Sequence, residues 1–424
     1  MDQFNLTIIG AGVVGSALGY ELSKTLDGIL VLDRNKLDRK TKRVLGENQS
    51  SRNSGVMHAG IYYDPAVKPL KAGLCVQGNE LLYQFCQEHH VPHRRTGKLV
   101  VAVQEYELEY LENTQRIADE NGVLGVEWIN QPQMGEFGLN DTRFTRNVHA
   151  LAALHVPTSG IIDSTSLVNK LRYVSQKTER VHFQYDSLVE SIESDESGFE
   201  LTIREAGEKF TFRTKKLINA AGLYADDIAR MVNPENTYVI IPVRGEAAKF
   251  YRRENDNLHA LGMNIYPAPY VHDIQGNKIL CSLQESKELS YRGKGRWTVG
   301  LHLTPTLGGY EKDNDRQFPL GKEITICPAK NKNFGKDDYV SDPRPMSYYH
   351  QQSAGFLHGL QEDELHPHQI GIMAVGKRSP QSVAQDWIME RDTKYPHCIH
   401  LMGIDSPGLT ASLAIAKYVI KNFI

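Results

Sequence analysis

The N-terminal stretch "FNLTIIGAGVVGSALGYELSKTLDGILVLD" (residues 4–33) decides the fold, because it contains the parts of a βαβ unit in order. The apolar segment "NLTIIG" is typical of a buried strand. The glycine-rich turn "GAGVVG" then leads into a segment with helical spacing, "VVGSALGYELSKTL". A second apolar strand, "GILVL", follows and is closed by Asp33. This order predicts a parallel, nucleotide-binding sheet at the start of the chain.

The residues of the glycine-rich turn have separate tasks. Gly10 permits the tight turn, Gly12 lets the backbone approach a pyrophosphate, and Gly15 lets the helix pack closely on the strands. Val14 belongs to the first helical turn, where free N–H groups and a partial positive charge favour a phosphate. We therefore predict that these residues bind a dinucleotide.

The end of the second strand indicates which dinucleotide is bound. Asp33 follows the glycines by about 20 residues, and its carboxylate can accept hydrogen bonds from a ribose diol. Its negative charge disfavours a 2′-phosphate, so FAD or NAD is expected rather than NADP. We include the adjacent Arg34 in the cofactor site. The helix is expected to turn its apolar positions toward the sheet, namely Val14, Leu18, Leu22 and Leu26.

Composition sets the broad class of the protein. Its 424 residues exceed one ordinary domain, so we expect two domains with a ligand cleft between them. Apolar residues make up 40% and charged residues 23%, which is typical of a globular enzyme. The formal net charge of −3 gives no reason to expect a nucleic-acid partner.

Cysteines and apolar runs bear on the compartment. The five cysteines are scattered and form no CxxC pair, which argues against a disulfide framework and against a zinc site, so no metal is predicted. The chain opens on a strand without a signal peptide, and no apolar run reaches the roughly 20 residues of a membrane span. We expect a cytoplasmic protein without a transmembrane segment, and peripheral contact with a membrane remains an alternative.

Two later segments favour FAD over NAD. Residues 217–230, "LINAAGLYADDIAR", read as a strand, a turn at Ala221-Gly222 and a helix. Residues 398–423 contain a strand, a Ser-Pro-Gly turn and a final helix that begins near Gly408 and Thr410. A helix N-terminus aimed at the ligand would stabilise the negative charge of a reduced flavin. A nicotinamide does not need this stabilisation by a helix N-terminus.

The stretch "SSRNSGVMHAGIYYD" (residues 50–64) has neither helical nor strand periodicity and combines small residues with a histidine and two tyrosines. His58 is the best single candidate for a proton acceptor, because an imidazole titrates near neutral pH. A structural histidine or a flavin contact is the alternative. Tyr62 and Tyr63 are either cleft residues or core aromatics with satisfied hydroxyls.

Six segments together carry a resemblance to a known family. The segments are "GAGVVGSALGYEL", the run "SSRNSGVMHAGIYYDPAVKPLKAGLCVQGNELLYQFC", "GKLVVA", "SGIIDSTSLVNKL", "LINAAG" and "GIDSPGLTASLAIA". In these segments the chain resembles the FAD-dependent oxidoreductases of the D-amino-acid oxidase superfamily. It is most similar to their L-2-hydroxyglutarate dehydrogenase/oxidase group. The resemblance covers about the first 250 and the last 25 residues and is poor between them.

The resemblance implies a fold that combines α/β and α+β parts. A Rossmann-like FAD-binding domain would be assembled from residues 1–85, 155–235 and 370–424. An antiparallel-sheet substrate domain would comprise residues 86–154 and 236–369 and cover the open face of the flavin.

The resemblance also assigns residues to the two ligands. His58, Tyr62 and Tyr63 would approach the substrate, and His302 with Thr304 would lie near the flavin, which makes His302 the rival base. Arg244 is the candidate anchor for a substrate carboxylate, with a surface or interdomain ion pair as the alternative. The segments expected to line the flavin contribute Ser51, Arg52, Asn53, Ser54, Gly55, Ala221, Gly222, Gly403, Gly408, Leu409 and Thr410.

The chain departs from the family pattern at several places. Met373 stands where the family has an arginine that grips the substrate carboxylate, and Lys377 or Arg378 are the possible replacements. Ala247-Ala248 replaces an aromatic pair and reshapes that wall of the cleft. Two polar insertions are expected to be surface loops or short hairpins that form a lid or contact a partner, at residues 271–296 and 310–350.

These features together predict FAD-dependent oxidation of a small 2-hydroxy acid, similar to L-2-hydroxyglutarate, to the 2-oxo acid. Oxygen, a quinone or an electron-transfer protein would accept the electrons. One alternative is an amine- or amino-acid-oxidising flavoenzyme of the same superfamily. The others are a flavin-binding scaffold without catalysis and an NAD-dependent dehydrogenase, which the C-terminal "DSPGLT" turn disfavours.

Overall fold

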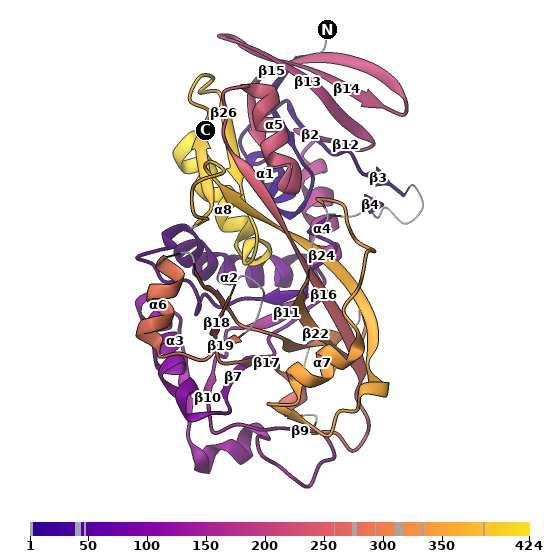
Figure 1. Ribbon diagram of the computed structural model, residues 1–424. Coiled ribbons are helices and arrows are strands. Elements are labelled where there is room, and N and C mark those ends of the chain that lie inside the picture. The colour runs from indigo at the N-terminus through magenta and orange to yellow at the C-terminus, as the bar shows by residue number, and fades with distance from the viewer. Residues whose placement is uncertain are drawn as a thin grey trace.

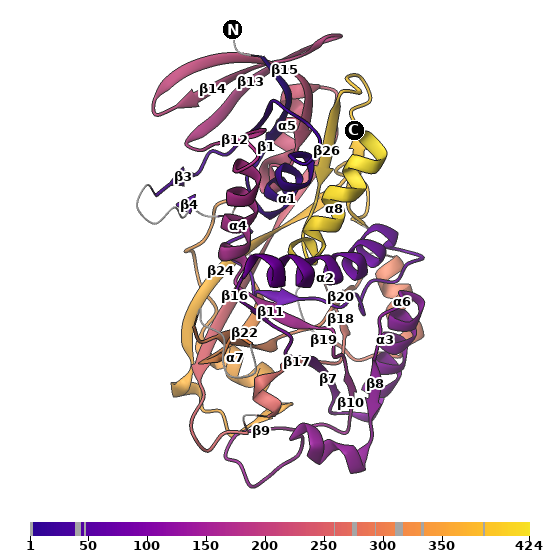
Figure 2. The same ribbon diagram turned by 180° about the vertical axis from the view of Figure 1, so that it is seen from behind.

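The computed structural model describes residues 3–38, 44–45, 48–257, 259–273, 278–292, 294–309, 317–331, 335–384 and 386–424. Two eight-stranded sheets form its two halves. One sheet lies in the upper half of Figure 1 and the other in the lower half, and helix α2 (Pro69–His89) crosses between them in both views (Figures 1 and 2).

The first sheet is built around the predicted βαβ unit. Its central strands run parallel, with Leu6 opposite Ile29 and Ile8 opposite Val31. A β-meander extends the sheet, and β25 pairs antiparallel with β26 at the far edge. The path runs through β12 (Val181–Gln184), β2 (Ile29–Leu32), β1 (Gln3–Ile9), β15 (Glu208–Asn219), β14 (Gly198–Glu205) and β13 (Ser187–Asp195), with β26 (Cys398–Met402) beside β15 and then β25 (Ile388–Arg391).

Helices cover both faces of this sheet. On one face α1 (Val13–Leu22) packs against α4 (Ser164–Gln176) and α8 (Gly408–Phe423), and α8 packs in turn on α2. On the other face α5 (Ala225–Val232) packs against β13 and β26. Helix α1 ends at Leu22, earlier than predicted, and it is buried on most sides rather than along one stripe. This arrangement is a Rossmann-like layered domain, as the sequence predicted.

The second sheet is mixed but mostly antiparallel, because the pairing of β17 with β7 is parallel and the others are antiparallel. Buried aliphatic side chains on its strands form a second core. In spatial order its strands are β24 (His366–Lys377), β16 (Val239–Tyr251), β22 (Leu320–Lys330), β21 (His302–Leu307), β17 (Asn264–Pro267), β7 (Lys98–Ala102), β10 (Ala152–His155) and β8 (Glu127–Ile129).

The two polar insertions contain more regular structure than predicted. Part of 310–350 forms β22, a strand that lies between β16 and β21 and buries Ile324 and Ile326. Part of 271–296 forms helix α6 (Leu283–Tyr291), which Ser282 caps by accepting a hydrogen bond from the Glu285 N–H. The expectation of surface loops was therefore wrong for these parts. The polar composition of the segment concealed a strand in which four consecutive residues, 324–327, are buried.

The remaining elements are short or peripheral. Helices α3 (Leu108–Glu120) and α7 (Met346–Ser353) pack in the lower half, as Figure 1 shows. Within the described part of the chain, no helix has both the length and the apolar character to cross a bilayer. Small sheets are formed by β3 (Lys36–Leu37) with β4 (Val44–Leu45), β5 (Val56–Met57) with β11 (Gly160–Ile162) and β6 (His93–Arg94), β18 (Tyr270–His272) with β19 (Lys278–Ile279) and β20 (Arg296–Thr298), and β9 (Asn147–Val148) with β23 (Leu357–His358).

Candidate active site

A cavity of about 1680 Å³ lies between the two sheets and is lined by residues from both halves. One end is formed by the glycine-rich turn, Asp33 and Ala221-Gly222 of the first sheet. The other end is formed by strands β16, β17, β21 and β24 of the second sheet. The cavity therefore extends from the predicted dinucleotide site to the predicted substrate domain.

The glycine-rich turn has the geometry that a dinucleotide needs. Gly10 has φ +107°, and a side chain there would collide with the carbonyl of Ala220. Gly12 and Val14 line the cavity. Gly15 does not line it, because it packs against the Gly10 carbonyl, which is the close packing of helix on strand that its position predicts.

Asp33 lines the cavity at the end of β2, and two backbone groups hold its carboxylate. The Ala11 N–H donates to Oδ2 and the Asn35 N–H to Oδ1, both at 2.8 Å. Burial raises the pKa of this carboxyl despite those hydrogen bonds. The neighbouring Arg34 also lines the cavity and lies over the ring of Tyr224, 3.7 Å from its centroid. Both residues lie where the sequence predicts a ribose contact.

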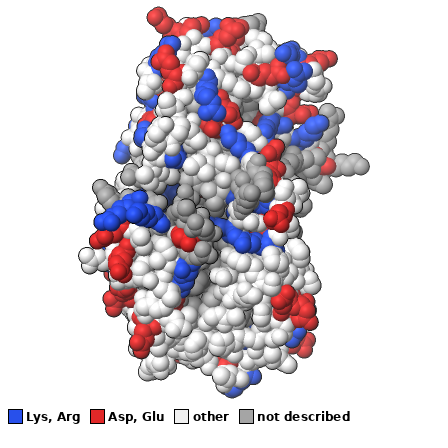
Figure 3. Space-filling model, in the orientation of Figure 1, with Lys and Arg blue, Asp and Glu red and all other residues white. Residues whose placement is uncertain are grey.

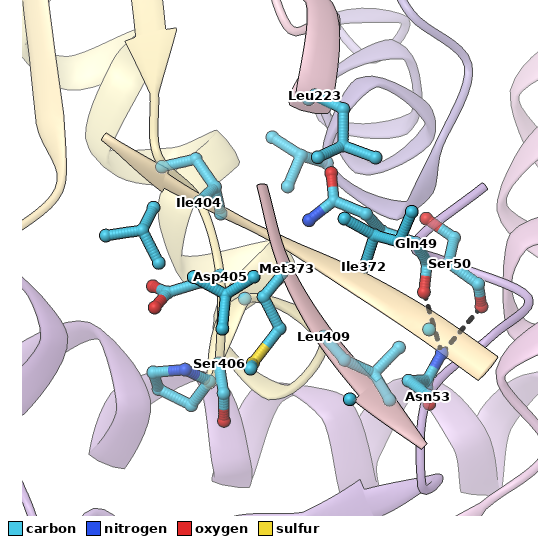
Figure 4. Close-up of a pocket in the computed structure, with 18 of the residues that line it drawn as sticks. Gln49, Ser50, Asn53, Leu223, Ile372, Met373, Ile404, Asp405, Ser406 and Leu409 are labelled. Atoms are coloured by element: carbon cyan, nitrogen blue, oxygen red, sulfur yellow. Dashed lines mark hydrogen bonds between the residues drawn. The ribbon is translucent and has the colours of Figure 1, made fainter. Parts of the chain in front are cut away.

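The loop from residue 48 to 55 closes over the same end of the cavity. The Asn53 side-chain amide donates to the carbonyls of Ser50 (2.8 Å) and Gln49 (3.3 Å), which are the dashed lines in Figure 4. The Ser50 hydroxyl accepts a hydrogen bond from the Val13 N–H at the start of α1 (2.9 Å). Ser50 and Gln49 line the cavity but were missed by the sequence analysis, which had predicted their neighbours Ser51, Arg52, Asn53 and Ser54 as lining residues, and these line it too.

Three predicted flavin contacts do not line the cavity. Gly55 has φ +65° and packs against the carbonyl of Ile162 on β11. Gly403 packs against Gly376 of β24. The hydroxyl of Thr410 accepts a hydrogen bond from the His58 N–H at 3.0 Å, so it positions that backbone. These residues hold together the segments that line the cavity, whereas Ala221, Gly222, Gly408 and Leu409 do line it.

Basic side chains surround much of the cavity, which suits an anionic ligand such as a pyrophosphate or a carboxylate. In the view of Figure 3, lysine and arginine side chains gather at the waist between the two halves. The basic residues that line the cavity are Arg34, Arg52, Lys68, Lys71, Lys287, Lys330 and Lys377.

His58 lies at the substrate end of the cavity, between the two halves. Its Nε2 is 3.4 Å from the hydroxyl of Ser406, and its Nδ1 is buried without a hydrogen-bond partner among the described residues. Burial, together with the positive charge of Lys98 and the nearby His302, lowers its pKa well below the usual value. The imidazole is therefore neutral at pH 7 and can accept a proton.

His302 lies on β21 and lines the same cavity. Its ring stacks on that of Tyr266, with centroids 3.8 Å apart and planes 13° apart. Its Nδ1 is 3.4 Å from the Gly300 carbonyl, and its Nε2 is 3.9 Å from the thiol of Cys327. Burial and Lys98 lower the pKa of His302 to about 3, so this imidazole is also neutral.

Both predicted tyrosines line the cavity, and a lysine that the sequence analysis missed lies behind one of them. The ring of Tyr62 stacks at 6.1 Å on Tyr266, while the hydroxyl of Tyr63 is 3.5 Å from Ser406. The Lys98 ammonium lies 3.8 Å from the centroid of the Tyr266 ring, and its side chain is 1% exposed. The strand "GKLVVA" carried the signal, because a lysine is rarely expected inside a buried strand.

Arg244 does not serve as an exposed carboxylate anchor, contrary to the prediction. Its side chain is completely buried, and its guanidinium pairs with Asp338 at 3.0 Å and with Glu246 at 2.9 Å. It is absent from the cavity lining, and its partners are buried residues of the same domain, so its contacts are neither a surface nor an interdomain ion pair. Thr304 is likewise buried in β21 and lies outside the lining. The sequence of β21 does not show which of its residues reach the cavity: His302 lines it, and Thr304, two residues further along the strand, does not.

Met373 lines the cavity, where the family pattern has an arginine. It lies opposite Val243 in the β16–β24 pair, and Figure 4 shows it near Asp405 and Ser406 of the C-terminal turn. The proposed replacements are engaged elsewhere. Lys377 donates to the Pro380 carbonyl at 2.6 Å, and Arg378 pairs with Glu390 at 2.6 Å. Of the alanine pair, Ala247 lines the cavity and Ala248 belongs to the core.

The insertion that contains α6 contributes to the cavity wall. Lys287 and Ser290 on α6 line it, as do Trp297 and Thr298 on β20. The insertion is docked on α3, where the Tyr110 hydroxyl donates to the Cys281 carbonyl at 2.9 Å. Polar residues of this insertion, Lys287 and Ser290, therefore form part of the wall of the cavity.

The cavity fits the expected dinucleotide. The glycine-rich turn leaves no room for side chains where the backbone meets the ligand, and the carboxylate of Asp33 is fixed beside it. The N-terminal ends of α1 and α8 both reach the lining, at Val13 and at Gly408. Two helix N-termini and several basic side chains suit a pyrophosphate and a reduced, anionic ring system.

Comparison with known proteins gives a family match over nearly the whole chain. A profile of the family described as "FAD dependent oxidoreductase" matches residues 5–421. The chain is 32% identical to the mitochondrial L-2-hydroxyglutarate dehydrogenase of Caenorhabditis briggsae, over 100% of this chain and 94% of the relative. It is 28% identical to the L-2-hydroxyglutarate dehydrogenase of Escherichia coli K12, over 99% and 93%.

Solved structures share the fold at low sequence identity. The FAD-bound L-alpha-glycerophosphate oxidase of Mycoplasma pneumoniae matches with a TM-score of 0.77 and 19% identity, over 99% of this chain and 94% of the other. The glycine oxidase of Geobacillus kaustophilus matches with a TM-score of 0.72 and 16% identity, over 99% and 94%. At these identities the likeness concerns the arrangement of the two sheets.

Proposed function

The chain belongs to the family of FAD-dependent oxidoreductases, with FAD as its cofactor, and from this premise we propose that it oxidises a small 2-hydroxy acid to the 2-oxo acid. L-2-Hydroxyglutarate is the first candidate substrate. The full-length relatives that support this choice are named as L-2-hydroxyglutarate dehydrogenases. We further propose that FAD is held by the half of the molecule that carries the parallel sheet.

The observation that carries the proposal is a pair of neutral imidazoles at the far end of the FAD cavity. His58 and His302 both line that end, and burial lowers the pKa of each below its usual value. A secondary alcohol needs a group that removes its hydroxyl proton while the hydride leaves its carbon. A neutral imidazole serves this purpose, and we assign His58 as the acceptor because its Nδ1 has no partner among the described residues.

Bound FAD would supply the acceptor for the hydride. The protein contributes orientation and exclusion of water. The stacked rings of Tyr62, Tyr266 and His302 form an apolar wall beside His58, which limits how the substrate can lie. Ser406 lies 3.4 Å from His58 Nε2 and 3.5 Å from the Tyr63 hydroxyl, so it holds the imidazole from the C-terminal turn.

An anaerobic titration of the purified holoprotein tests the proposal. The absorbance of the flavin near about 450 nm is followed while 2-hydroxy acids and, separately, amino acids are added. We expect L-2-hydroxyglutarate to bleach the flavin and the amino acids to leave it unchanged. Re-admission of oxygen, and then of a quinone, identifies the electron acceptor from the rate at which the absorbance returns.

Other outcomes point to other functions. Bleaching by other 2-hydroxy acids alone would retain the reaction and assign the changed specificity to the wall that contains Met373. Bleaching by amino acids alone would replace the proposal with amine oxidation. A flavin that only dithionite reduces would indicate a scaffold.

A further inference from the structure

Lys98 is a buried cation that has no anionic partner within the described ranges of the chain. It begins strand β7, and its side chain is 1% exposed. In the part of the chain that the structure describes, it forms no ion pair with a carboxylate. The ionisable groups that face it are the thiol of Cys75 on α2, the imidazoles of His58 and His302, and the phenols of Tyr62 and Tyr266.

Those neighbours do not neutralise an ammonium at physiological pH. Burial raises the pKa of the Cys75 thiol to about 12 and the pKa values of both phenols above their usual range. An unpaired buried charge is far more costly than a paired one, so an anion that enters next to it gains a strong interaction. The position therefore calls for an anionic ligand.

Lys98 does not itself line the cavity, but its ammonium lies against the rings of two tyrosines that do, and these surroundings are suited to a carboxylate. Its ammonium lies 3.8 Å from the Tyr266 ring centroid and 5.2 Å from that of Tyr62, and both rings line the cavity. The hydroxyl oxygens of both tyrosines are buried without a hydrogen-bond partner among the described residues. A phenol donates one hydrogen bond, and a carboxylate accepts several.

Two other cations near the substrate end, Arg244 and Lys71, are already paired with carboxylates. Arg244 binds Asp338 and Glu246, and Lys71 binds Asp405 at 2.6 Å. Met373 cannot supply a charge. Lys98, by contrast, has no carboxylate partner among the described residues and is the cation that lies against the rings of Tyr62 and Tyr266.

We propose that Lys98 is a positioning residue that supplies the positive charge for a substrate carboxylate, toward which Tyr62 and Tyr266 turn their hydroxyls. The inference rests on the proposed function, because a 2-hydroxy acid is an anion at neutral pH. It goes beyond that function in naming the charge that selects the acid over a neutral alcohol or ester. Burial, together with the same charge, lowers the pKa values of His58 and His302 and keeps both imidazoles unprotonated.

The test measures ligand binding without turnover. The holoprotein is titrated with 2-oxoglutarate, which cannot reduce the flavin, and with its uncharged dimethyl ester, and the shift of the flavin spectrum gives Kd. Lys98→Met removes the charge and keeps the length of the side chain, and Lys98→Arg keeps the charge. We expect K98M to raise Kd for the diacid at least tenfold, K98R to stay within a few-fold of wild type, and neither to change binding of the ester.

The pH dependence of the same Kd provides a second readout. Burial lowers the pKa of Lys98 to about 7, so its charge is present below that pH and is lost above it. The wild-type Kd for the diacid should therefore rise as pH increases through 7, while K98R should remain flat because a guanidinium stays charged.

Three results would overturn the inference: an unchanged Kd in K98M with full FAD content, an equal loss in K98M and K98R, or no preference of the wild type for the diacid over the ester. The proposed function fails separately. If wild type binds the diacid in a Lys98-dependent manner but no 2-hydroxy acid bleaches its flavin, the anion site stands and the oxidation does not.

Discussion

At the scale of single residues, the two imidazoles differ in what their nitrogens contact. His302 has a contact at each nitrogen and a ring stacked on Tyr266. The Nδ1 of His58 has no hydrogen-bond partner among the described residues. His58 is held through its backbone, because its N–H donates to Thr410 and its carbonyl accepts from Asn79 at 2.9 Å. His302 is therefore placed as part of a wall, and His58 as a group that can exchange a proton.

Replacing His58 with glutamine should lower kcat about 10²- to 10⁴-fold, which is the usual contribution of a general base. Glutamine keeps a polar side chain of similar size, so FAD content and melting temperature should stay near wild type. His302→Gln is the matched control and should reduce kcat less. Stopped-flow measurement of flavin bleaching separates the two. A larger loss in H302Q than in H58Q would transfer the role of base to His302.

The pH dependence of kcat/KM tests the environment of His58. Burial, then Lys98, then His302 lower the pKa of this imidazole, so it is already neutral at pH 7. The rate should therefore fall on the acid side only below pH 6.5, where the base becomes protonated. On the alkaline side it should fall above pH 7, where Lys98 loses the charge that binds the substrate. In K98M one of the two positive influences is gone, so the acid limb should move to higher pH. An acid limb at the same pH in both proteins would contradict the coupling.

Lys98 should reduce stability while it serves binding. Because the pKa of Lys98 is lower in the folded state than in the unfolded chain, the folded state binds fewer protons between pH 7 and the ordinary lysine value of about 10.4. Its cost is therefore full below pH 7 and fades as pH rises. K98M should stabilise the protein by roughly 1–3 kcal/mol at pH 7 and by less at pH 9, as measured by chemical denaturation. A destabilised K98M at pH 7 would contradict the unpaired state of the ammonium.

At the scale of elements, the βαβ unit shows how closely the turn fits between its neighbours. Gly10 to Ala should prevent FAD binding, because φ +107° is strained for alanine and its methyl would collide with the Ala220 carbonyl. The strain alone costs about 1–3 kcal/mol. Gly73 to Ala on α2 is the control, since no atom lies within 4 Å of the added methyl. G10A should purify colourless and G73A yellow, and a yellow G10A would show that the turn can relax.

The same elements show how far sequence reasoning reaches. The unit at residues 4–33 was predictable because the turn, the helix and the strands are contiguous in the sequence. Strand β22 was not, since it lies inside a segment of polar composition and one of its partners, β16, is distant in the sequence. For a related reason, the predicted role of Arg244 was wrong and Lys98 was missed. Whether a cation is paired depends on acids such as Asp338 that only the fold brings near.

At the scale of the whole molecule, the cavity couples the two halves. The first sheet supplies the glycine-rich turn and the second supplies the strands β16 and β24, which run from one half toward the other in Figures 1 and 2. Gly371 of β24 packs against the Arg52 carbonyl, and Gly376 against Gly403. The halves are therefore held by backbone contacts around the cavity, and a ligand that fills it touches both.

Removal of FAD should accordingly destabilise the whole protein rather than one half. A ligand that binds only the folded state adds RT ln(1 + [L]/Kd), which is about 2.7 kcal/mol at a hundredfold excess over Kd. The apoprotein should melt in one transition at a lower temperature, and added FAD should raise that temperature in proportion to the logarithm of its concentration. Far-ultraviolet circular dichroism and intrinsic fluorescence should report the same midpoint, because the tryptophans Trp128, Trp297 and Trp387 belong to both halves. Two separated transitions, with only one of them sensitive to FAD, would show instead that the halves unfold independently and that the cavity is completed by only one of them.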